Sequence, residues 1–216
     1  MRSIGDVVKS ALTRDPVVEE ARESGRLVDL PEVRRASRES GWRSRGIPER
    51  LWPMLHDGAP DETVGPLAPK PSPALEAVGR FTSPSERRLV LVLAGPVDSG
   101  KTTAAAWAAA WAHGRLVKAI DLLRAGLYPD DHGFWPRLYA EHLLVVDDLG
   151  TEPLDAKGFG LAAISDLIDR RYDGARKTIL TTNLPGAAFR SRFGERLWRR
   201  LVEVGMWIDL APLERK

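Results

Sequence analysis

The stretch that decides the fold is Leu89-Val90-Leu91-Val92-Leu93-Ala94-Gly95-Pro96-Val97-Asp98-Ser99-Gly100-Lys101-Thr102. Its first part, residues 89–94, is apolar throughout, which is typical of a strand buried on both faces of a parallel sheet. Residues 95–102 match the pattern G-x-x-x-x-G-K-[ST], and the alanine-rich residues 102–112 predict a helix. A glycine-rich turn between such a strand and such a helix predicts a loop that binds phosphate groups.

The chemistry expected of this loop is the binding of ATP with Mg²⁺. Backbone N–H groups curl around the phosphates, aided by the positive end of the following helix. Lys101 is expected to reach the β- and γ-phosphates, and the Thr102 hydroxyl to bind Mg²⁺. Asp98 stands where many such loops have glycine, and its carboxylate is expected to weaken nucleotide binding. The residues predicted to bind the nucleotide are Gly95, Pro96, Val97, Asp98, Ser99, Gly100, Lys101, Thr102 and Thr103.

A second apolar stretch, residues 143–146, is followed by two acids, Asp147 and Asp148. In phosphate-loop enzymes, a carboxylate at the end of an apolar strand holds Mg²⁺, directly or through water, and we assign that role to Asp147. Asp148 is then placed to polarise the attacking water, with Glu152 as a lower-ranked third acid. Such a pair of acids also occurs as a plain turn, but its company with a complete phosphate loop favours the catalytic interpretation.

Two later segments supply further candidates. Residues 178–181 predict a strand that leads into Thr182 and Asn183, and an amide at that strand end can reach the γ-phosphate and the attacking water. In the cationic segment 195–201, Arg196 or Arg200 is a candidate arginine finger, a side chain that stabilises charge in the transition state. A cationic helix end is also commonly just a solvated face.

The order of segments predicts how the chain is organised. Residues 1–57 predict a segment of short helices, for which partner docking is one candidate role, and the proline- and glycine-rich residues 58–73 predict a linker. Residues 74–216 alternate strands and helices, which predicts an α/β domain. With further strands expected at 116–120 and 206–210, the prediction is a five-stranded parallel sheet sandwiched by helices.

Composition excludes several classes of protein. The 216 residues include no cysteine, which rules out disulfides, thiolate zinc sites and thiol catalysis. The sequence shows no signal peptide and no apolar run near the roughly 20 residues that cross a membrane, so we expect a cytoplasmic protein. The net charge is only +2, but arginines gather in residues 34–50 and 190–200. These clusters predict contacts with DNA phosphates or, equally, a solvated charged face.

Together these motifs resemble the AAA+ ATPases of the bacterial helicase-loader and transposition-helper group (DnaC/IstB type). The resemblance implies an oligomeric ATPase that binds DNA and works with a replicative helicase or a transposase. It also implies that Asn183 takes the sensor-one position and that Arg200, with Arg196 in reserve, takes the finger position. The residues after Asn183 are too few for the helical lid of many AAA+ proteins, so a P-loop NTPase domain without a C-terminal helical lid is expected. The matching stretches are 46–50, 95–102, 121–123, 144–152, 171–172, 181–185 and 194–201.

Two other functions remain open from the sequence. One is a P-loop kinase for a small molecule or nucleotide, which needs a mobile lid with arginines and an acceptor pocket. The other is a binding module that nucleotide switches with little turnover, which the acid at position 98 favours. An ATPase assay separates the three functions. Stimulation by DNA favours the accessory factor, dependence on an acceptor favours the kinase, and absence of turnover favours the binding module.

Overall fold

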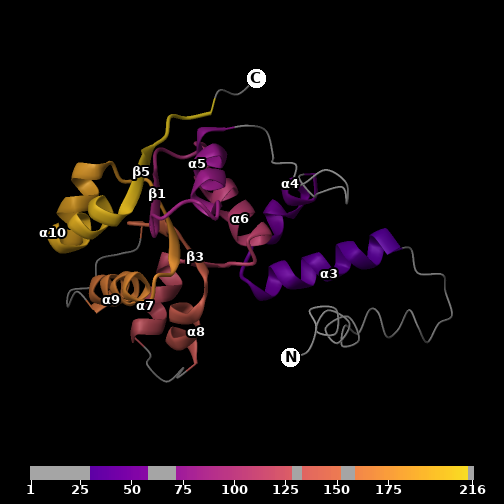
Figure 1. Cartoon of the computed structure of the whole chain (residues 1–216), viewed down its shortest axis with the longest axis horizontal. Helices are drawn as coiled ribbons and strands as arrows, with labels where there is room; N and C mark the ends of the chain where they lie inside the picture. The colour runs from indigo at the N-terminus through magenta and orange to yellow at the C-terminus, as the bar shows by residue number, and fades with distance from the viewer. Residues whose placement is uncertain (1–29, 58–71, 128–132, 152–158, 214–216) are drawn as a thin grey trace. The chain divides into compact units, whose positions relative to one another are not determined.

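The computed structural model of the chain describes residues 30–57, 72–127, 133–151 and 159–213 (Figure 1). The chain divides into two compact units, Met1–Ser44 and Arg45–Lys216. In the first unit the described part is a helix, α3 (Leu30–Ser44), on which Arg35 pairs with Glu39 one turn later at 3.0 Å. The predicted linker lies outside the described residues except for its last two positions.

The second unit contains the predicted five-stranded parallel sheet, which is confirmed. Its strands lie in the order β2-β3-β4-β1-β5, and every neighbouring pair is parallel. In the register of the sheet, Val90 lies opposite Thr178 on one side and Gly205 on the other. The strands are β1 (Val90–Ala94), β2 (Arg115–Lys118), β3 (Leu143–Leu149), β4 (Lys177–Thr182) and β5 (Gly205–Asp209).

Helices cover both faces of this sheet (Figure 1). On one face α5 contacts β1 and α6 contacts β2, β3 and β4. On the other face α7 contacts β2 and β3, α9 contacts β4, and α10 contacts β1 and β5. The short helix α8, which the sequence did not predict, packs on α9. The helices are α5 (Pro73–Thr82), α6 (Lys101–Trp111), α7 (Ala119–Leu127), α8 (Phe134–Ala140), α9 (Phe159–Asp173) and α10 (Gly186–Val204).

The strands are buried because their apolar side chains alternate between two cores. Val90 and Val92 join the core under α7, α8, α9 and α10, and the intervening Leu91 and Leu93 are fully buried as well. Successive side chains of a strand point to opposite faces, so the apolar run of β1 fills both layers. The prediction that this run is a strand buried on both faces is therefore confirmed.

A fully buried arginine joins three elements of the second unit. The Arg171 guanidinium donates to the Thr178 hydroxyl on β4 at 2.9 Å and to the carbonyls of Leu138, Glu141 and Lys177. Burial lowers the pKa of Arg171 to about 10, so it keeps its charge at neutral pH. This side chain fixes the end of α9 to the end of α8 and the start of β4, and it explains why the sequence places an arginine among apolar positions.

The segment before α5 extends the edge of the sheet at β2. The Leu116 amide donates to the Arg45 carbonyl at 2.9 Å, and a Cβ on Gly46 would lie only 2.3 Å from the Leu116 carbonyl oxygen. Gly46 also has a φ of 77°, so glycine is required there on two counts. The chain then forms a 3-10 helix (Glu49–Leu51) and α4 (Trp52–Asp57).

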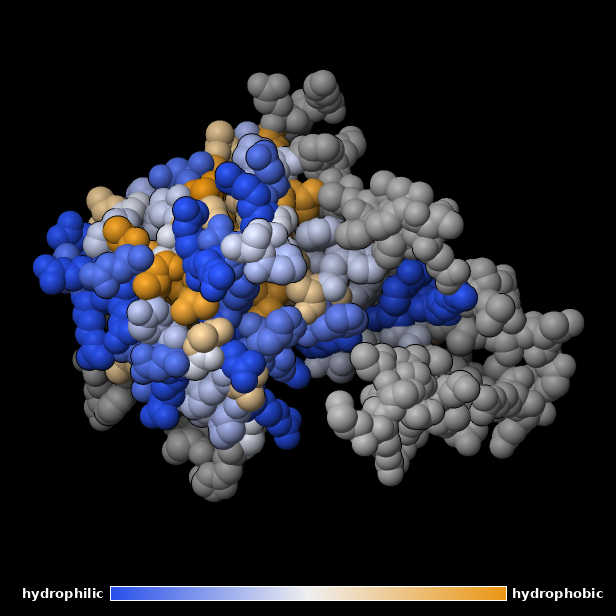
Figure 2. All heavy atoms as spheres, viewed as in Figure 1, coloured by the Kyte–Doolittle hydropathy of each residue, from blue (hydrophilic) through white to orange (hydrophobic). Residues whose placement is uncertain are grey.

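Among the described residues, the face seen in Figure 2 is largely hydrophilic. Figure 2 shows hydrophilic side chains over much of the outer side of α10, with hydrophobic residues in small separate patches. Within the described residues, no helix is long and apolar enough to cross a membrane. The large apolar side chains that are exposed in this part of the chain are Met54, Val97, Val202 and Leu213.

Candidate active site

The predicted phosphate loop connects β1 to α6. Gly100, with a φ of 80°, precedes the first residue of the helix, Lys101. The Lys101 side chain is 5% exposed, and its Nζ donates to the Pro96 carbonyl at 2.6 Å and to the Ser99 hydroxyl at 3.1 Å. Burial lowers the pKa of Lys101, and the nearby carboxylates, chiefly that of Asp148, oppose this shift. The ammonium group therefore lies folded back over the loop, where the phosphates are expected.

Asp147 lies at the centre of the candidate site. Its carboxylate is 1% exposed, and its Oδ1 accepts hydrogen bonds from the hydroxyls of Thr102 at 2.9 Å and Thr181 at 2.7 Å. Its Oδ2 is buried and has no hydrogen-bond partner among the described residues. Burial raises the pKa of Asp147, whereas the bonds from Thr181 and Thr102 act in the opposite direction.

This arrangement fits Mg²⁺, which prefers oxygen ligands and keeps several waters. The buried Oδ2 of Asp147 offers an acceptor whose desolvation is otherwise uncompensated. The Thr102 hydroxyl lies beside it at the start of α6. In the described residues, no group of three or more His, Cys, Asp or Glu side chains could hold a metal ion, so a cation here would depend on these two oxygens, water and phosphate.

The second acid, Asp148, has an unusual backbone conformation. Its φ is 59°, in the left-handed region, and the pairing of β3 with β4 shifts register between Val146 and Leu149. The amide of Asp148 donates to the Thr181 hydroxyl at 2.9 Å. Thr181 thus bonds to the side chain of Asp147 and to the backbone of Asp148, so it holds the Asp147 carboxylate and the chain at Asp148 in place.

This role of Thr181 was not predicted. The sequence placed Thr181, Thr182 and Asn183 together at a strand end but assigned the chemistry to the amide alone. The signal that could have revealed it is topological, because the carboxyl ends of neighbouring parallel strands meet at one edge of a sheet. Thr182 likewise donates to the Leu149 carbonyl, at 2.6 Å, and Asn183 then emerges exposed just beyond β4. Glu152 lies outside the described residues.

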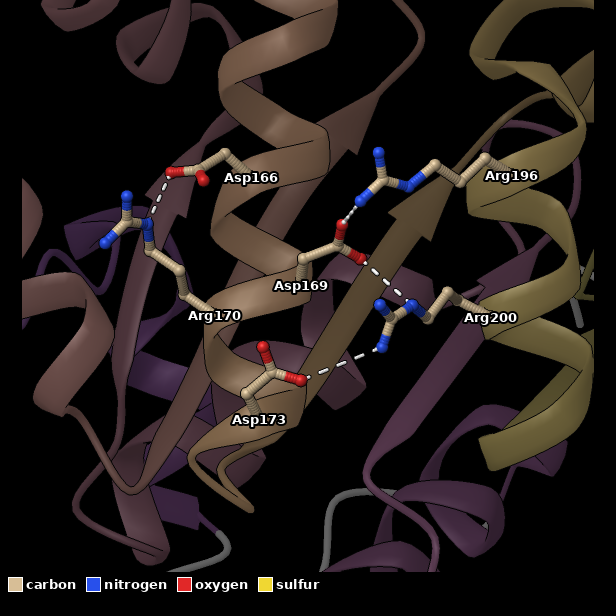
Figure 3. A network of polar contacts seen from close by, with 6 residues as sticks. All are labelled: Asp166, Asp169, Arg170, Asp173, Arg196 and Arg200. Carbon is tan, nitrogen blue, oxygen red and sulfur yellow. Dashed lines mark hydrogen bonds and ion pairs between the residues drawn. The ribbon is translucent and has the colours of Figure 1, made fainter.

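The two candidate finger arginines lie on α10 and pair with acids of α9 in the same chain (Figure 3). Asp169 bonds to both, at 2.8 Å to Arg196 and 3.2 Å to Arg200. Arg200 also pairs with Asp173 at 3.8 Å and lies 4.8 Å from the centre of the Tyr172 ring. The Arg196 side chain is 83% exposed and that of Arg200 only 30%, so Arg200 is the more firmly held of the two.

A glycine divides α10 into two helical halves. Gly194 has a φ of 86° and a ψ of 164°, and the helix kinks there. Phe189, before the kink, meets the Trp207 ring of β5 edge-to-face at 5.3 Å between ring centres, and Trp198, after it, meets the same ring edge-to-face at 5.2 Å. This packing fixes the two halves against β5, and it sets the surface on which Arg196 and Arg200 are displayed.

The site residues predicted from the sequence are therefore brought together only in part. The loop lysine, Thr102, Asp147 and Asp148 gather at the carboxyl ends of β1 and β3, and Asn183 follows β4 at the same edge of the sheet. The two arginines lie against α9. The catalytic and ligand roles of all these residues stay predictions.

Comparison with known proteins supports the fold. No model of a protein family matches the sequence, and no curated protein matches it either. Among solved structures, the DnaC helicase loader is similar with a TM-score of 0.57 and 22% identity, over 76% of this chain and 99% of that one. DnaI is similar with a TM-score of 0.52 and 18% identity, over 63% of this chain and 82% of that one.

A third similar structure is the replication initiator DnaA bound to AMPPCP and single-stranded DNA. Its TM-score is 0.56 at 19% identity, and the match covers 76% of this chain but only 50% of that one. At such identities the likeness concerns the fold alone. The described part of residues 45–216 therefore has an α/β fold similar to those of DnaC, DnaI and DnaA.

Proposed function

We propose that this protein is a Mg²⁺-dependent ATPase that acts on DNA as an accessory factor, as a helicase loader or transposition helper does. The observation that carries the proposal is the buried carboxylate of Asp147 on β3, which accepts a hydrogen bond from Thr102 in the first turn of α6. One oxygen accepts two threonine hydroxyls, and the other has no partner within the described residues. A buried carboxylate with an uncompensated oxygen is costly unless a cation binds there, which favours a function for the site.

Within this proposal each residue at the site has a distinct task. Lys101 offsets the charge of the β- and γ-phosphates, and Thr102 and Asp147 hold Mg²⁺. Asp148, whose backbone amide is held by the Thr181 hydroxyl, polarises the attacking water, and Asn183 orients that water at the γ-phosphate. Mg²⁺ would supply charge neutralisation between the phosphates, and the chain's own groups would supply position.

The action on DNA rests on two kinds of support. The fold is shared with a helicase loader and with an initiator solved on single-stranded DNA. The chain also has arginines whose planar, always-charged side chains suit phosphates, on α3 and in residues 45–50. On α10 four arginines pair with Glu195 or Asp169, and on α3 Arg35 pairs with Glu39. We keep both arginine clusters, residues 34–50 and 190–200, as candidate DNA contacts.

We further propose that the protein forms homo-oligomers in which Arg200 acts on the nucleotide of a neighbouring subunit, with Arg196 as the reserve. The contacts with Asp169 favour a specific second candidate, a nucleotide switch that turns over slowly while subunits are separate. In that case the arginines stay paired with α9, and nucleotide changes the conformation rather than being consumed.

The test measures ATP binding and hydrolysis with Mg²⁺, with and without single-stranded DNA. Lys101→Ala should abolish turnover, and Asp147→Asn should keep the fold but lose Mg²⁺-dependent hydrolysis. Asp121→Asn makes the same chemical change at an exposed position on α7 and should hydrolyse ATP normally. Normal turnover in both site variants would remove the ATPase assignment. Stimulation by DNA supports the accessory factor, dependence on an added acceptor the kinase, and binding without turnover the switch.

A further inference from the structure

The segment that follows β5 lies along the phosphate loop. Beyond Asp209 the Leu210 amide donates to the Ala94 carbonyl at 2.7 Å, and three residues later the Leu213 amide donates to the Asp98 carbonyl at 3.1 Å. A Cβ on Gly95 would lie 2.5 Å from the Leu210 carbonyl oxygen. We call residues 210–213 the brace segment, because they contact the loop at its beginning and in its middle.

The brace segment also reaches the end of the loop. A Cβ on Gly100 would lie 3.3 Å from a methyl group of Leu213, whose side chain is 45% exposed. The loop therefore lies between α6, which it begins, and a stretch of extended chain that its own sheet places beside it. Two backbone hydrogen bonds fix that placement without any side chain.

The bond to Asp98 has a particular consequence for phosphate binding. Asp98 has a φ of 64°, and the left-handed conformation costs a residue with a side chain roughly 1 kcal/mol relative to glycine. A phosphate loop functions only if its N–H groups point inward. Because the peptide bond is planar and trans, holding the Asp98 carbonyl toward the brace segment turns the Ser99 N–H to the opposite side.

We propose that the brace segment keeps the loop in its phosphate-binding conformation, and that the Leu213 N–H is the positioning group that holds the Asp98 turn. The proposal explains how an aspartate serves at a position where many such loops have glycine. The hydrogen bond from Leu213 restrains the left-handed turn at Asp98, whereas glycine would adopt that turn without a restraint. It deepens the proposed function, because it concerns the affinity of the same site for nucleotide.

The experiment removes the backbone N–H of residue 213 and uses a second variant to control for the change of side chain. Leu213→Pro deletes the N–H donor, and it follows Pro212, where an extended backbone is already favoured. Leu213→Ala is the matched control, because it trims the side chain and keeps the donor. Binding of a fluorescent ATP analogue with Mg²⁺ should weaken about fivefold in Leu213→Pro, which corresponds to about 1 kcal/mol for one hydrogen bond, and by less than about twofold in Leu213→Ala.

A second pair of variants tests the link to Asp98. In a background of Asp98→Gly, the left-handed turn needs no outside restraint, so the same Leu213→Pro change should cost less than about twofold. Comparison within each background removes the effect of the lost carboxylate charge on the phosphates. An equal loss in both backgrounds would overturn the proposal, and so would an equal loss in Leu213→Pro and Leu213→Ala.

A measurement without nucleotide tests the role of the brace segment independently of the proposed ATPase function. Amide hydrogen exchange of peptides covering residues 95–103 should quicken at least threefold in Leu213→Pro, while peptides from β3 and β4 keep their wild-type rates. If the wild-type protein fails to bind ATP but this exchange quickens, the proposed function is wrong and the brace stands. Unchanged exchange across the loop refutes the brace, whatever the nucleotide data show.

Discussion

Replacing Thr181 with valine removes one oxygen from the centre of the site and keeps the shape of the side chain. The hydroxyl is fully buried, donates to Asp147 Oδ1 at 2.7 Å and accepts from the Asp148 amide at 2.9 Å. A hydrogen bond to a charged group contributes roughly 1.5–3 kcal/mol, and an amide left without a partner costs roughly 1–3 kcal/mol. Asp148 is half-buried, so water recovers part of the second loss.

We therefore expect Thr181→Val to lower the free energy of unfolding by about 3 kcal/mol, or the melting temperature by about 9 °C in a domain of this size. The matched control is Thr182→Val. Its hydroxyl is equally buried and also makes two bonds, to the Leu149 carbonyl at 2.6 Å and from the Leu184 amide at 3.1 Å. Both variants should lose stability, but only the first touches a carboxylate.

The pH dependence distinguishes the two variants. The bond from Thr181 is one of the contacts that restrain the raised pKa of Asp147, so its loss raises that pKa further. Because Mg²⁺ needs the ionised carboxylate, the acid limb of the hydrolysis rate should move to higher pH in Thr181→Val and stay in place in Thr182→Val. A raised folded-state pKa favours folding at low pH and withdraws that contribution as pH rises, so the stability gap should be smaller below pH about 4 than at pH 7.

The assays are chemical denaturation at both pH values and ATP hydrolysis from acid to neutral pH. If the acid limbs of the two variants coincide, Thr181 does not act through the Asp147 carboxylate, and the functional role of the hydrogen bond between these two side chains is refuted.

Three further predictions concern other parts of the chain. Arg171→Met should lower the free energy of unfolding by about 3 kcal/mol, because it strips the partner from several buried acceptors, whereas the exposed neighbour variant Arg170→Met should leave stability nearly unchanged; equal losses by denaturation contradict the buried network. Arg200→Ala mixed with Lys101→Ala, each inactive alone, should recover hydrolysis if the finger acts between subunits, and no recovery in mixtures that still assemble makes Arg200 structural. Binding to DNA should weaken steeply with salt and show little sequence preference, so salt-insensitive binding in a titration counts against contacts of residues 34–50 and 190–200 with phosphates.

The sheet could be predicted from the sequence because its strands are marked by local patterns of adjacent residues. Residues 89–94 and 143–146 are uninterrupted apolar runs, and the loop between β1 and α6 obeys a spacing rule that depends only on adjacent residues. Ser72 caps α5 as its position before Pro73 predicts, accepting from the Leu75 amide at 3.2 Å. The helix α8 was missed because its short sequence, which contains a proline, has no recognisable helical period.

The missed parts of the site depend on contacts between distant residues. No local pattern near Thr181 shows that β4 lies next to β3, so its bonds to both acids could be predicted only from the topology of the sheet. Asp169 gives no local sign that it pairs with arginines on another helix. The contact of Leu213 with the loop follows from the register of β5 on β1, which no local pattern encodes.

The strand order has a consequence for folding during synthesis on the ribosome. β1 pairs only with β4 and β5 in the sheet, so the partners of Val90 are Thr178 and Gly205, far downstream. At a synthesis rate of roughly 5–20 residues per second, the apolar run of β1 waits on the order of ten seconds for its neighbours. During that time a stretch of high β-propensity has no native partner, so β1 is the segment on which a chaperone or aggregation would act first.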